Sequence, residues 1–411
     1  MSDEIVSLQL PYGLSGRFQA TLLARQLLIH HRAPGGVSDP QQQVKQALNV
    51  PVDFPEVRRA FVPGDHVAVV VDVDTPDADH VFLELWKTLA AAGVQPAEIT
   101  LIQPAVWKTV DGIDPRRALP AEVREQIPLI RHDPTAEDSC AYLASTAGNE
   151  RVYMSRVIID ADVVVTVGPA EFDPVLGIRG TASSLYPGLS DLEALQRVKG
   201  QGHEELGPDD SRPMRQIIDE VGWLLGLQLS IAVIPSGGIS AHEVIAGQAD
   251  SVLRRARKKL KSNWLVHMPE RAELVLVTVP RDAAGHHWDQ VAAAVDVGRR
   301  MVERNGRIVV LSELSAPPGP GLEILKSVRE PRDAIKPIQR AQPPDMLAAV
   351  RIAAAADWAN VSFLSKLNAD LVSDFFMLPL ENEREVQRLL EMEDLTAIVE
   401  AAQHAFVVSG S

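Results

Sequence analysis

The stretch that decides the fold reads Val163-Val164-Val165-Thr166-Val167 and continues as Gly168-Pro169-Ala170-Glu171-Phe172-Asp173-Pro174-Val175-Leu176-Gly177-Ile178-Arg179-Gly180-Thr181-Ala182-Ser183-Ser184-Leu185-Tyr186-Pro187-Gly188. Its first five residues are mostly apolar and β-branched, which predicts a buried strand. The rest is dense in glycine and proline, which predicts a loop. Proteins that alternate strands and helices bind ligands in loops after the carboxyl ends of parallel strands. We therefore expect an α/β fold with a ligand-binding loop here.

A second strand and its crossover helix support a parallel sheet. The run from His66 to Asp72 is short and β-branched and ends in a carboxylate, which is typical of a buried strand. Residues His80–Ala92 have apolar side chains at helical spacing, and Gly93 ends that helix. A further strand follows at Ile99–Ile102. This strand–helix–strand order predicts two parallel strands joined by a right-handed connection.

The C-terminal third repeats the α/β pattern. We predict a strand at Leu274–Val279, a helix over His287–Arg304 closed by Asn305-Gly306, and a strand at Arg307–Leu311. The polar segment Lys261–Arg271 separates this pattern from the preceding one. We therefore predict a larger N-terminal domain over residues 1–265 with a mainly parallel sheet, a smaller α/β domain over residues 270–411, and a ligand cleft between them.

Other segments are assigned by periodicity alone. Residues 242–261 and 345–367 are predicted to be mostly helical, and residues 371–376 are predicted to form a strand.

Composition excludes several classes of partner. The chain has 411 residues, enough for two or three domains, and 46% of them are hydrophobic. Its formal net charge of −15 disfavours binding to nucleic acid and to anionic membranes. Cys140 is the only cysteine, so neither an internal disulfide nor a cysteine-based zinc site can form. With no signal-like or membrane-spanning segment, we expect a cytoplasmic location.

Several short motifs together resemble the nickel-dependent lactate racemase family, over roughly residues 12–408. The shared positions are Tyr12-Gly13, Asp72 with Pro76, the loop residues Glu171, Gly177, Gly180 and Pro187-Gly188, and, further on, Gln290 and Trp358. The resemblance implies a lactate racemase-like two-domain α/β fold. It also implies racemase or epimerase activity on a small 2-hydroxy acid. In that family a lysine carries a covalently attached nickel-pincer nucleotide, one histidine binds the metal, and two further histidines act as acid and base.

The chain departs from the family at the positions that carry this chemistry. Ser183 stands at the lysine position, Asp173 at the first loop histidine, Trp107 at the catalytic histidine of an earlier loop, and Thr75 at an arginine. The metal-binding histidine falls at Lys199, or at His203 if a short insertion is allowed. A serine hydroxyl cannot replace an amine that attaches a cofactor, and an indole only donates a hydrogen bond. We therefore predict no metal site and no attached nickel-pincer nucleotide.

Candidate site residues follow from the aligned positions and from residue chemistry. The catalytic candidates are Asp72, Asp173, Lys199 and His203, and the ligand-binding candidates are Trp107, Lys108, Arg179, Ser183, Gln290 and Trp358. Three of these have structural alternatives. Asp72 can equally cap the next helix, Asp173 can close a turn before Pro174, and Arg179 can form a salt bridge rather than bind an anion.

Three functions remain open from the sequence. The first is a divergent racemase or epimerase that acts on a small hydroxy acid without the nickel-pincer mechanism. The second is an acid–base isomerase or lyase that uses Asp72, Asp173 and Lys199. The third is a non-catalytic protein that keeps the site to bind or sense a small carboxylate.

Overall fold

The computed structural model of the chain describes residues 4–106, 110–198 and 206–409, which form two compact units. Unit 2 contains the described residues between Gly35 and Ser262. Unit 1 combines the N-terminal segment up to Pro34 with the segment from Asn263 onward. The chain therefore passes from unit 2 into unit 1 between Ser262 and Asn263. The first strands of the chain belong to unit 1, because they complete the sheet that the C-terminal segment builds.

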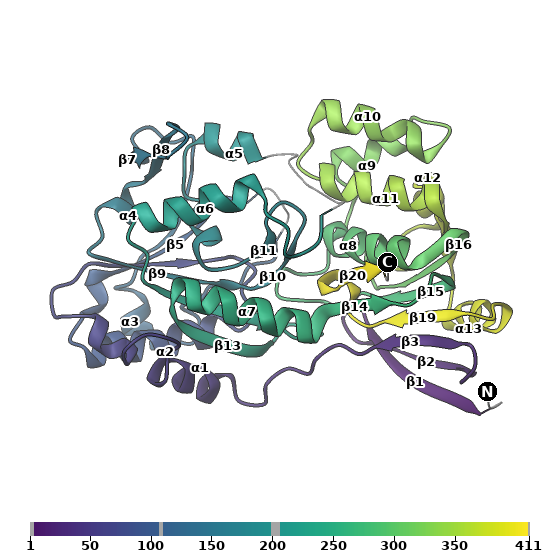
Figure 1. Cartoon of the computed structure of the whole chain (residues 1–411), viewed down its shortest axis with the longest axis horizontal. Coiled ribbons are helices and arrows are strands. Elements are labelled where there is room, and N and C mark those ends of the chain that lie inside the picture. The colour runs from purple at the N-terminus through teal and green to yellow at the C-terminus, as the bar shows by residue number, and fades with distance from the viewer. Residues whose placement is uncertain (1–3, 107–109, 199–205, 410–411) are drawn as a thin grey trace. The chain divides into compact units, whose positions relative to one another are not determined.

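The sheet of unit 2 has six strands in the order β13-β12-β9-β4-β5-β6, and all neighbouring strands are parallel except β12 and β13 (Figure 1). The predicted pair of parallel strands is confirmed as β4 and β5, with α2 between them. The strands of this sheet are β4 (Val67–Val71), β5 (Ile99–Gln103), β6 (Leu129–Arg131), β9 (Val163–Pro169), β12 (Leu229–Pro235) and β13 (Ala241–Gln248).

Helices cover both faces of this sheet. Val67, Val69 and Val71 of β4 pack into one apolar core with α1, α2 and β13, whereas Ala68 and Val70 pack into another with α4, α5 and α6. Burial on both faces explains why β4 is uninterrupted in apolar character. The helices of unit 2 are α1 (Pro40–Asn49), α2 (Ala78–Ala91), α3 (Ala121–Arg124), α4 (Arg156–Ile159), α5 (Leu192–Val198), α6 (Pro213–Leu224) and α7 (Ala249–Trp264).

Short strands and single-turn helices complete unit 2. Two antiparallel hairpins, β7 with β8 and β10 with β11, lie outside the large sheet. Their bounds, with those of the 3-10 turns, are β7 (Cys140–Ser145), β8 (Arg151–Ser155), β10 (Glu171–Asp173), β11 (Gly177–Arg179), η1 (Val57–Ala60), η2 (Pro96–Glu98) and η3 (Thr181–Ser184).

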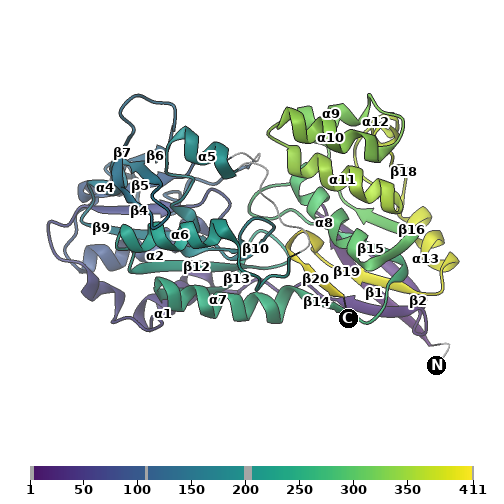
Figure 2. The same ribbon diagram turned by 45° about the horizontal axis from the view of Figure 1, so that its top comes forward.

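Unit 1 is built on a second six-stranded sheet, in the order β18-β17-β16-β15-β19-β3, with parallel pairing throughout. In Figure 2 the purple N-terminal strands lie beside the green and yellow C-terminal strands of this unit. The strands are β3 (Leu27–His31), β15 (Ala272–Thr278), β16 (Val302–Leu311), β17 (Asn360–Leu364), β18 (Leu378–Leu380) and β19 (Thr396–Val399).

The two faces of this sheet are covered differently. One face packs with α8 and α11 in the larger apolar core, and the other packs with the β1–β2 hairpin and α13. A short parallel pair, β14 with β20, lies beside it. The remaining elements are β1 (Ile5–Tyr12), β2 (Gly16–Leu23), β14 (Leu265–Met268), β20 (Phe406–Ser409), α8 (Trp288–Met301), α9 (Pro320–Leu325), α10 (Pro331–Ala341), α11 (Met346–Trp358), α12 (Ala369–Asp374), α13 (Glu383–Met392) and η4 (Ala402–His404).

Four local predictions are wrong. The helix predicted to reach Arg304 ends at Met301, and Asn305-Gly306, predicted to close it, lie within β16. Residues 242–248 form strand β13 instead of a helix, because they pair with β12 over its whole length. The helix predicted over 345–367 ends at Trp358 and gives way to β17, which joins the sheet beside β16. The strand predicted at 371–376 is helix α12, whose first turn is capped by the Asn368 side chain.

None of the helices in the described part of the chain combines the length and the apolar character needed to cross a bilayer.

Candidate functional site

The connections of the unit 2 sheet place a switch of direction between β4 and β9. From β4 the chain moves outward to β5 and β6 on one side, and then returns to build β9, β12 and β13 on the other. Ligands in open α/β sheets bind at such a point, outside the carboxyl ends of the strands. Asp72 follows β4 here, and its backbone N–H donates to the Val167 carbonyl of β9 at 2.9 Å. The loop after β9 starts at the same edge.

Asp72 is buried at this edge, with 6% of its surface exposed. Its Oδ2 accepts hydrogen bonds from Ser184 Oγ at 2.9 Å and from Arg179 Nη2 at 3.3 Å. Gly168 makes this approach possible, because a Cβ at that position would lie 2.5 Å from Asp72 Oδ2 and 2.8 Å from Ser184 Oγ. This glycine near the end of β9 is thus required for the contact between Asp72 and Ser184.

Arg179 lies at the centre of a buried ion cluster formed with Asp72, Asp74 and Glu171. Its Nη1 lies 2.8 Å from Asp74 Oδ2 and 3.4 Å from Glu171 Oε2, and its Nη2 also pairs with Asp74 Oδ1. The arginine side chain is 16% exposed. Three carboxylates thus contact one guanidinium in the part of the chain that the structure describes. An anionic ligand would therefore compete with three carboxylates of the protein for the Arg179 guanidinium.

Burial and neighbouring charges act in opposite directions on this cluster. Burial raises the pKa of the Asp72 carboxyl, Arg179 lowers it, and Asp74 raises it again, so that the net shift is upward. Burial works against the charge of Arg179, but Asp74 and Asp72 hold its pKa well above the ordinary value. Asp72 is therefore a carboxyl that takes up a proton more readily than one in water, at the sheet edge where α/β proteins as a class bind ligands.

The loop that follows β9 is an ordered hairpin. Glu171 pairs with Arg179 across β10 and β11, and Asp173 pairs with Gly177. Asp173 Oδ1 accepts the backbone N–H groups of Val175 and Leu176, each at 2.8 Å. The carboxylate thus closes the turn of the hairpin, which is the structural alternative that the sequence left open for this residue.

Ser183 and Thr75, which stand where the resemblance places the cofactor lysine and an arginine, form hydrogen bonds with nearby backbone groups. Ser183 lies in η3, and its Oγ accepts the N–H of Gly180 at 2.8 Å. Thr75 is buried, and its Oγ1 donates to the carbonyl of Asp72 at 2.7 Å. Both side chains therefore fix the backbone next to the ion cluster.

Four predicted site residues, Trp107, Lys108, Lys199 and His203, lie outside the described residues. Within the ranges that are described, no group of three or more His, Cys, Asp or Glu side chains is arranged to hold a metal ion.

In unit 1 Gln290 lies in the first turn of α8, directly after the loop that follows β15. Its Oε1 accepts the N–H of His287 at 2.9 Å, and its Nε2 lies 3.4 Å from Asp282 Oδ1. The sequence did not predict Asp282 and His404 as site residues. Asp282 follows β15 and His404 follows β19, and Asp282 Oδ2 lies 3.6 Å from His404 Nε2. These strand ends flank the switch point of the second sheet. Asp282 could have been found from the sequence, because it follows a buried strand in the same way as Asp72.

Trp358 lies away from Gln290. Its Nε1 donates to the carbonyl of Val302 at 3.1 Å, and Arg271 and Arg304 lie over its ring at 5.0 and 5.1 Å. Val302 follows the last residue of α8, whereas Gln290 is in its first turn. Twelve residues of helix separate these two points by roughly 18 Å. The structure therefore does not bring these two predicted ligand-binding residues together, and the cleft expected between the two domains stays a prediction.

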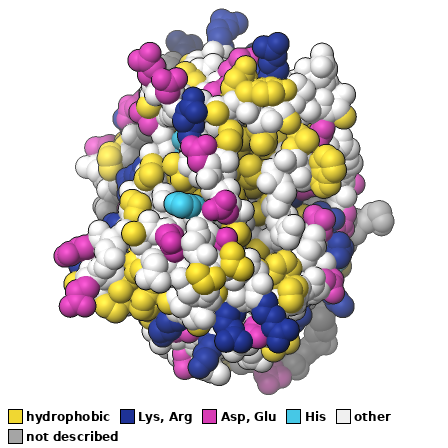
Figure 3. All heavy atoms as spheres, turned by 90° about the vertical axis from the view of Figure 1, so that its left-hand side faces the viewer, with side chains coloured by type: hydrophobic (Ala, Val, Ile, Leu, Met, Phe, Trp, Pro, Cys, Tyr) yellow, Lys and Arg dark blue, Asp and Glu magenta, His cyan; other side chains and the backbone are white. Residues whose placement is uncertain are grey.

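Charged side chains of both signs are spread over the face shown in Figure 3, with apolar side chains in small groups between them. That face presents no broad field of a single charge.

Comparison with known proteins identifies the relatives of this fold. Residues 16–203 match the family described as the lactate racemase N-terminal domain. The structure of the lactate racemase apoprotein from Thermoanaerobacterium thermosaccharolyticum is similar, with a TM-score of 0.76 and 15% identity over 98% of this chain and 100% of that one. A crystal structure of a protein from Thermotoga maritima has a TM-score of 0.62 and 11% identity, over 92% and 100% of the two chains. No curated protein sequence matches the chain.

Proposed function

We propose that this chain binds a small 2-hydroxy acid or a related carboxylate and isomerises it as a racemase or epimerase. The match of residues 16–203 to the lactate racemase N-terminal domain and the likeness of the fold to a lactate racemase apoprotein support this proposal. The observation that carries the proposal is Asp72. It is a buried carboxyl with a raised pKa at the switch point of the unit 2 sheet, where α/β proteins bind ligands. A carboxyl of this kind can take a proton from carbon and return it.

The nickel-pincer nucleotide has no place in this proposal, because the residues at its family positions do not fit it. Ser183 offers a hydroxyl that already accepts the Gly180 N–H, and a hydroxyl cannot stand in for an attaching amine. Asp173 uses one carboxylate oxygen to close the hairpin turn. The proposed chemistry is therefore proton transfer by side chains of this chain.

We assign the proposed roles to residues at the carboxyl edge of the unit 2 sheet and to three candidate residues from the sequence, Lys108, Lys199 and His203. Asp72 takes the proton from the substrate carbon, and Ser184 and Arg179 orient its carboxyl group. Lys199 and His203 are the candidates for the group that returns a proton to the opposite face. Because Arg179 already pairs with three carboxylates, we assign the substrate carboxylate to Lys108 or Lys199 instead of Arg179.

Solvent exchange provides the test. Single enantiomers of lactate, malate and related hydroxy acids are incubated with the protein in D2O, and chirality and deuterium at the hydroxy-bearing carbon are measured. Proton transfer predicts inversion with deuterium incorporation, and Asp72→Asn should abolish both. Asp250→Asn, an exposed carboxylate at the start of α7, is the matched control and should react as wild type. Inversion without deuterium would indicate hydride chemistry and refute the role of Asp72.

A second function, binding without catalysis, is favoured by the engagement of Asp173, Ser183 and Arg179 in contacts of the protein with itself. It predicts that hydroxy acids raise the melting temperature in a saturable way without any exchange or inversion. Absence of both stabilisation and turnover for every carboxylate would contradict the two functions together.

A further inference from the structure

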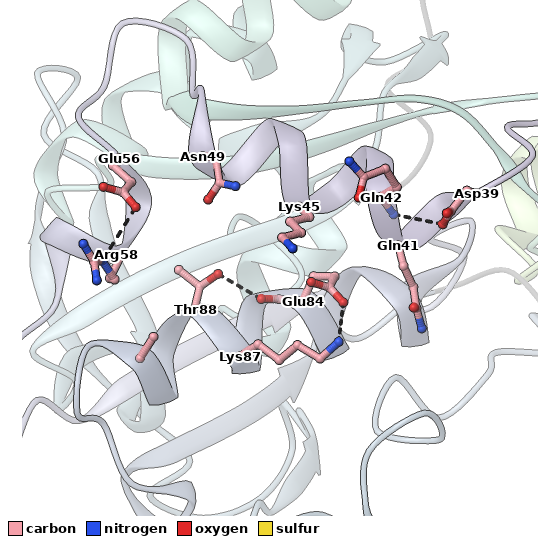
Figure 4. A pocket seen from close by; sticks show the side chains of 11 residues that line it. Asp39, Gln41, Gln42, Lys45, Asn49, Glu56, Arg58, Glu84, Lys87 and Thr88 are labelled. Atoms are coloured by element: carbon pink, nitrogen blue, oxygen red, sulfur yellow. Dashed lines mark hydrogen bonds and ion pairs between the residues drawn. The ribbon is translucent and has the colours of Figure 1, made fainter.

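A polar pocket lies between α1, α2 and η1 of unit 2, on elements separate from those that form the ion cluster (Figure 4). Its volume is about 500 Å³, within the range of small-molecule sites. All but one of the lining side chains, that of Ala91, are polar or charged. They are Asp39, Gln41, Gln42, Lys45, Asn49, Glu56, Arg58, Glu84, Lys87 and Thr88. A lining of this kind excludes an apolar ligand.

The charges of the lining balance. Three carboxylates, those of Asp39, Glu56 and Glu84, meet three cations, those of Lys45, Arg58 and Lys87. A ligand with a single charge can pair with the groups of opposite sign but also lies near three groups of its own sign, which weaken its binding. A molecule that carries both charges can place each beside its opposite.

Glu84 and Lys45 are the two groups that can receive such a molecule. The Glu84 side chain is only 8% exposed, and Lys87 Nζ lies 2.6 Å from one of its oxygens. Within the described part of the chain, Lys45 forms no ion pair. Figure 4 shows the Lys45 side chain extending from α1 toward α2, the helix that carries Glu84. A fixed buried carboxylate and an unpaired ammonium group thus lie on neighbouring helices.

The other charged groups are less available. Asp39 caps α1, where its Oδ1 accepts the N–H of Gln42 at 3.0 Å. Glu56 and Arg58 already face each other, at 3.6 Å between Oε1 and Nε. The amide side chains of Gln42 and Asn49 can add hydrogen bonds of either sense.

We propose that this pocket binds a small zwitterion of the class that amino acids and short peptides belong to. The carboxylate of the ligand pairs with Lys45, and its ammonium group pairs with Glu84. The site is independent of the isomerase site proposed at Asp72.

Calorimetric titration with glycylglycine tests the proposal. N-acetylglycine, which keeps only the carboxylate, and glycinamide, which keeps only the ammonium group, are the comparison ligands. We expect saturable binding of glycylglycine. Each comparison ligand should bind with a dissociation constant about fivefold higher, because each lacks one ion pair and an exposed ion pair contributes up to about 1 kcal/mol. Lys45→Met and Glu84→Gln should each weaken the binding of glycylglycine to a similar extent.

Matched controls separate the pocket from general effects of charge. Lys258→Met on α7 and Glu122→Gln on α3 change exposed residues of the same unit and should bind as wild type. Thermal melts confirm that each variant is folded. Absence of saturable binding would overturn the proposal, as would equal binding of N-acetylglycine or unchanged binding in both pocket variants.

Discussion

Replacing Arg179 by methionine leaves three carboxylates of unit 2 without their shared cation. The side chain is 16% exposed and pairs with Asp72, Asp74 and Glu171. Removing one partner of a buried ion pair typically costs about 3–5 kcal/mol, because the charge left behind remains buried. The partial exposure of Glu171 and of Arg179 itself puts our expectation at the lower end, about 3 kcal/mol. For a unit of this size, that corresponds to a fall of roughly 6–12 °C in melting temperature.

The loss should depend on pH in a predictable direction. Burial raises the pKa of Asp72 in the folded protein, and Arg179 opposes that shift, so Arg179→Met raises the pKa further. An acid with a raised folded pKa binds more protons when folded, and stability therefore falls as pH rises from the unfolded value toward the folded one. The variant should consequently lose most at pH 8 and recover part of its stability near pH 5.

Thermal and urea unfolding at the two pH values provide the assay. Arg254→Met is the control, since that side chain is 69% exposed and its pair with Asp53 is 3.8 Å long, and a change within about 0.5 kcal/mol is expected. Adding Asp74→Asn to Arg179→Met should restore part of the loss, because it removes one of the three carboxylates that have lost their shared cation. A loss below about 1 kcal/mol with no dependence on pH would refute the reasoning, because the carboxylates would then not be uncompensated.

The remaining predictions concern two other positions in unit 2. Gly168→Ala places a Cβ within 2.5 Å of Asp72 Oδ2, so the strand and loop must separate. We expect a loss of about 1–3 kcal/mol in urea unfolding, together with weaker binding of the proposed ligand at Asp72. Gly148→Ala is the control, since its added Cβ would lie 3.6 Å from Thr146 Oγ1, an ordinary contact, and it should change neither. Burial raises the pKa of the Cys140 thiol. Alkylation by iodoacetamide at pH 7.5 should therefore be slower in the folded protein than in urea, and should accelerate as pH rises toward 10; equal rates in both states would contradict this.

The sequence predicted the elements whose signals are local. β4, α2 and β5 were predicted because an apolar β-branched run, a helical period and a closing glycine lie within one short segment. The place of Asp72 followed, because parallel strands bring their carboxyl ends to one edge. Asp173 as a turn residue was also among the sequence-based alternatives.

The elements that were missed depend on partners distant in the chain. β13 forms because β12 offers an antiparallel edge, and β17 forms because β16 offers a parallel one, and neither edge is visible in local periodicity. The ion cluster joins Arg179 to Asp74 across 105 residues, so its charge balance could not be derived from the loop alone. Trp358 matched a family position, but its indole bonds to backbone at the far end of α8.

The pairing of β3 with β19 has a consequence for how the protein is made. Leu27 of β3 lies beside Thr396 of β19. β3 is synthesised early and therefore cannot pair until β19 is synthesised, near the end of translation. All the strands of the unit 2 sheet, in contrast, are complete once Gln248 has left the ribosome. Domains fold as units, and those finished first fold first. Unit 2 should therefore form the sheet edge that holds Asp72 while β3 still lacks β19 and the β1–β2 hairpin still lacks the sheet against which it packs. Both are then exposed to chaperones and proteases.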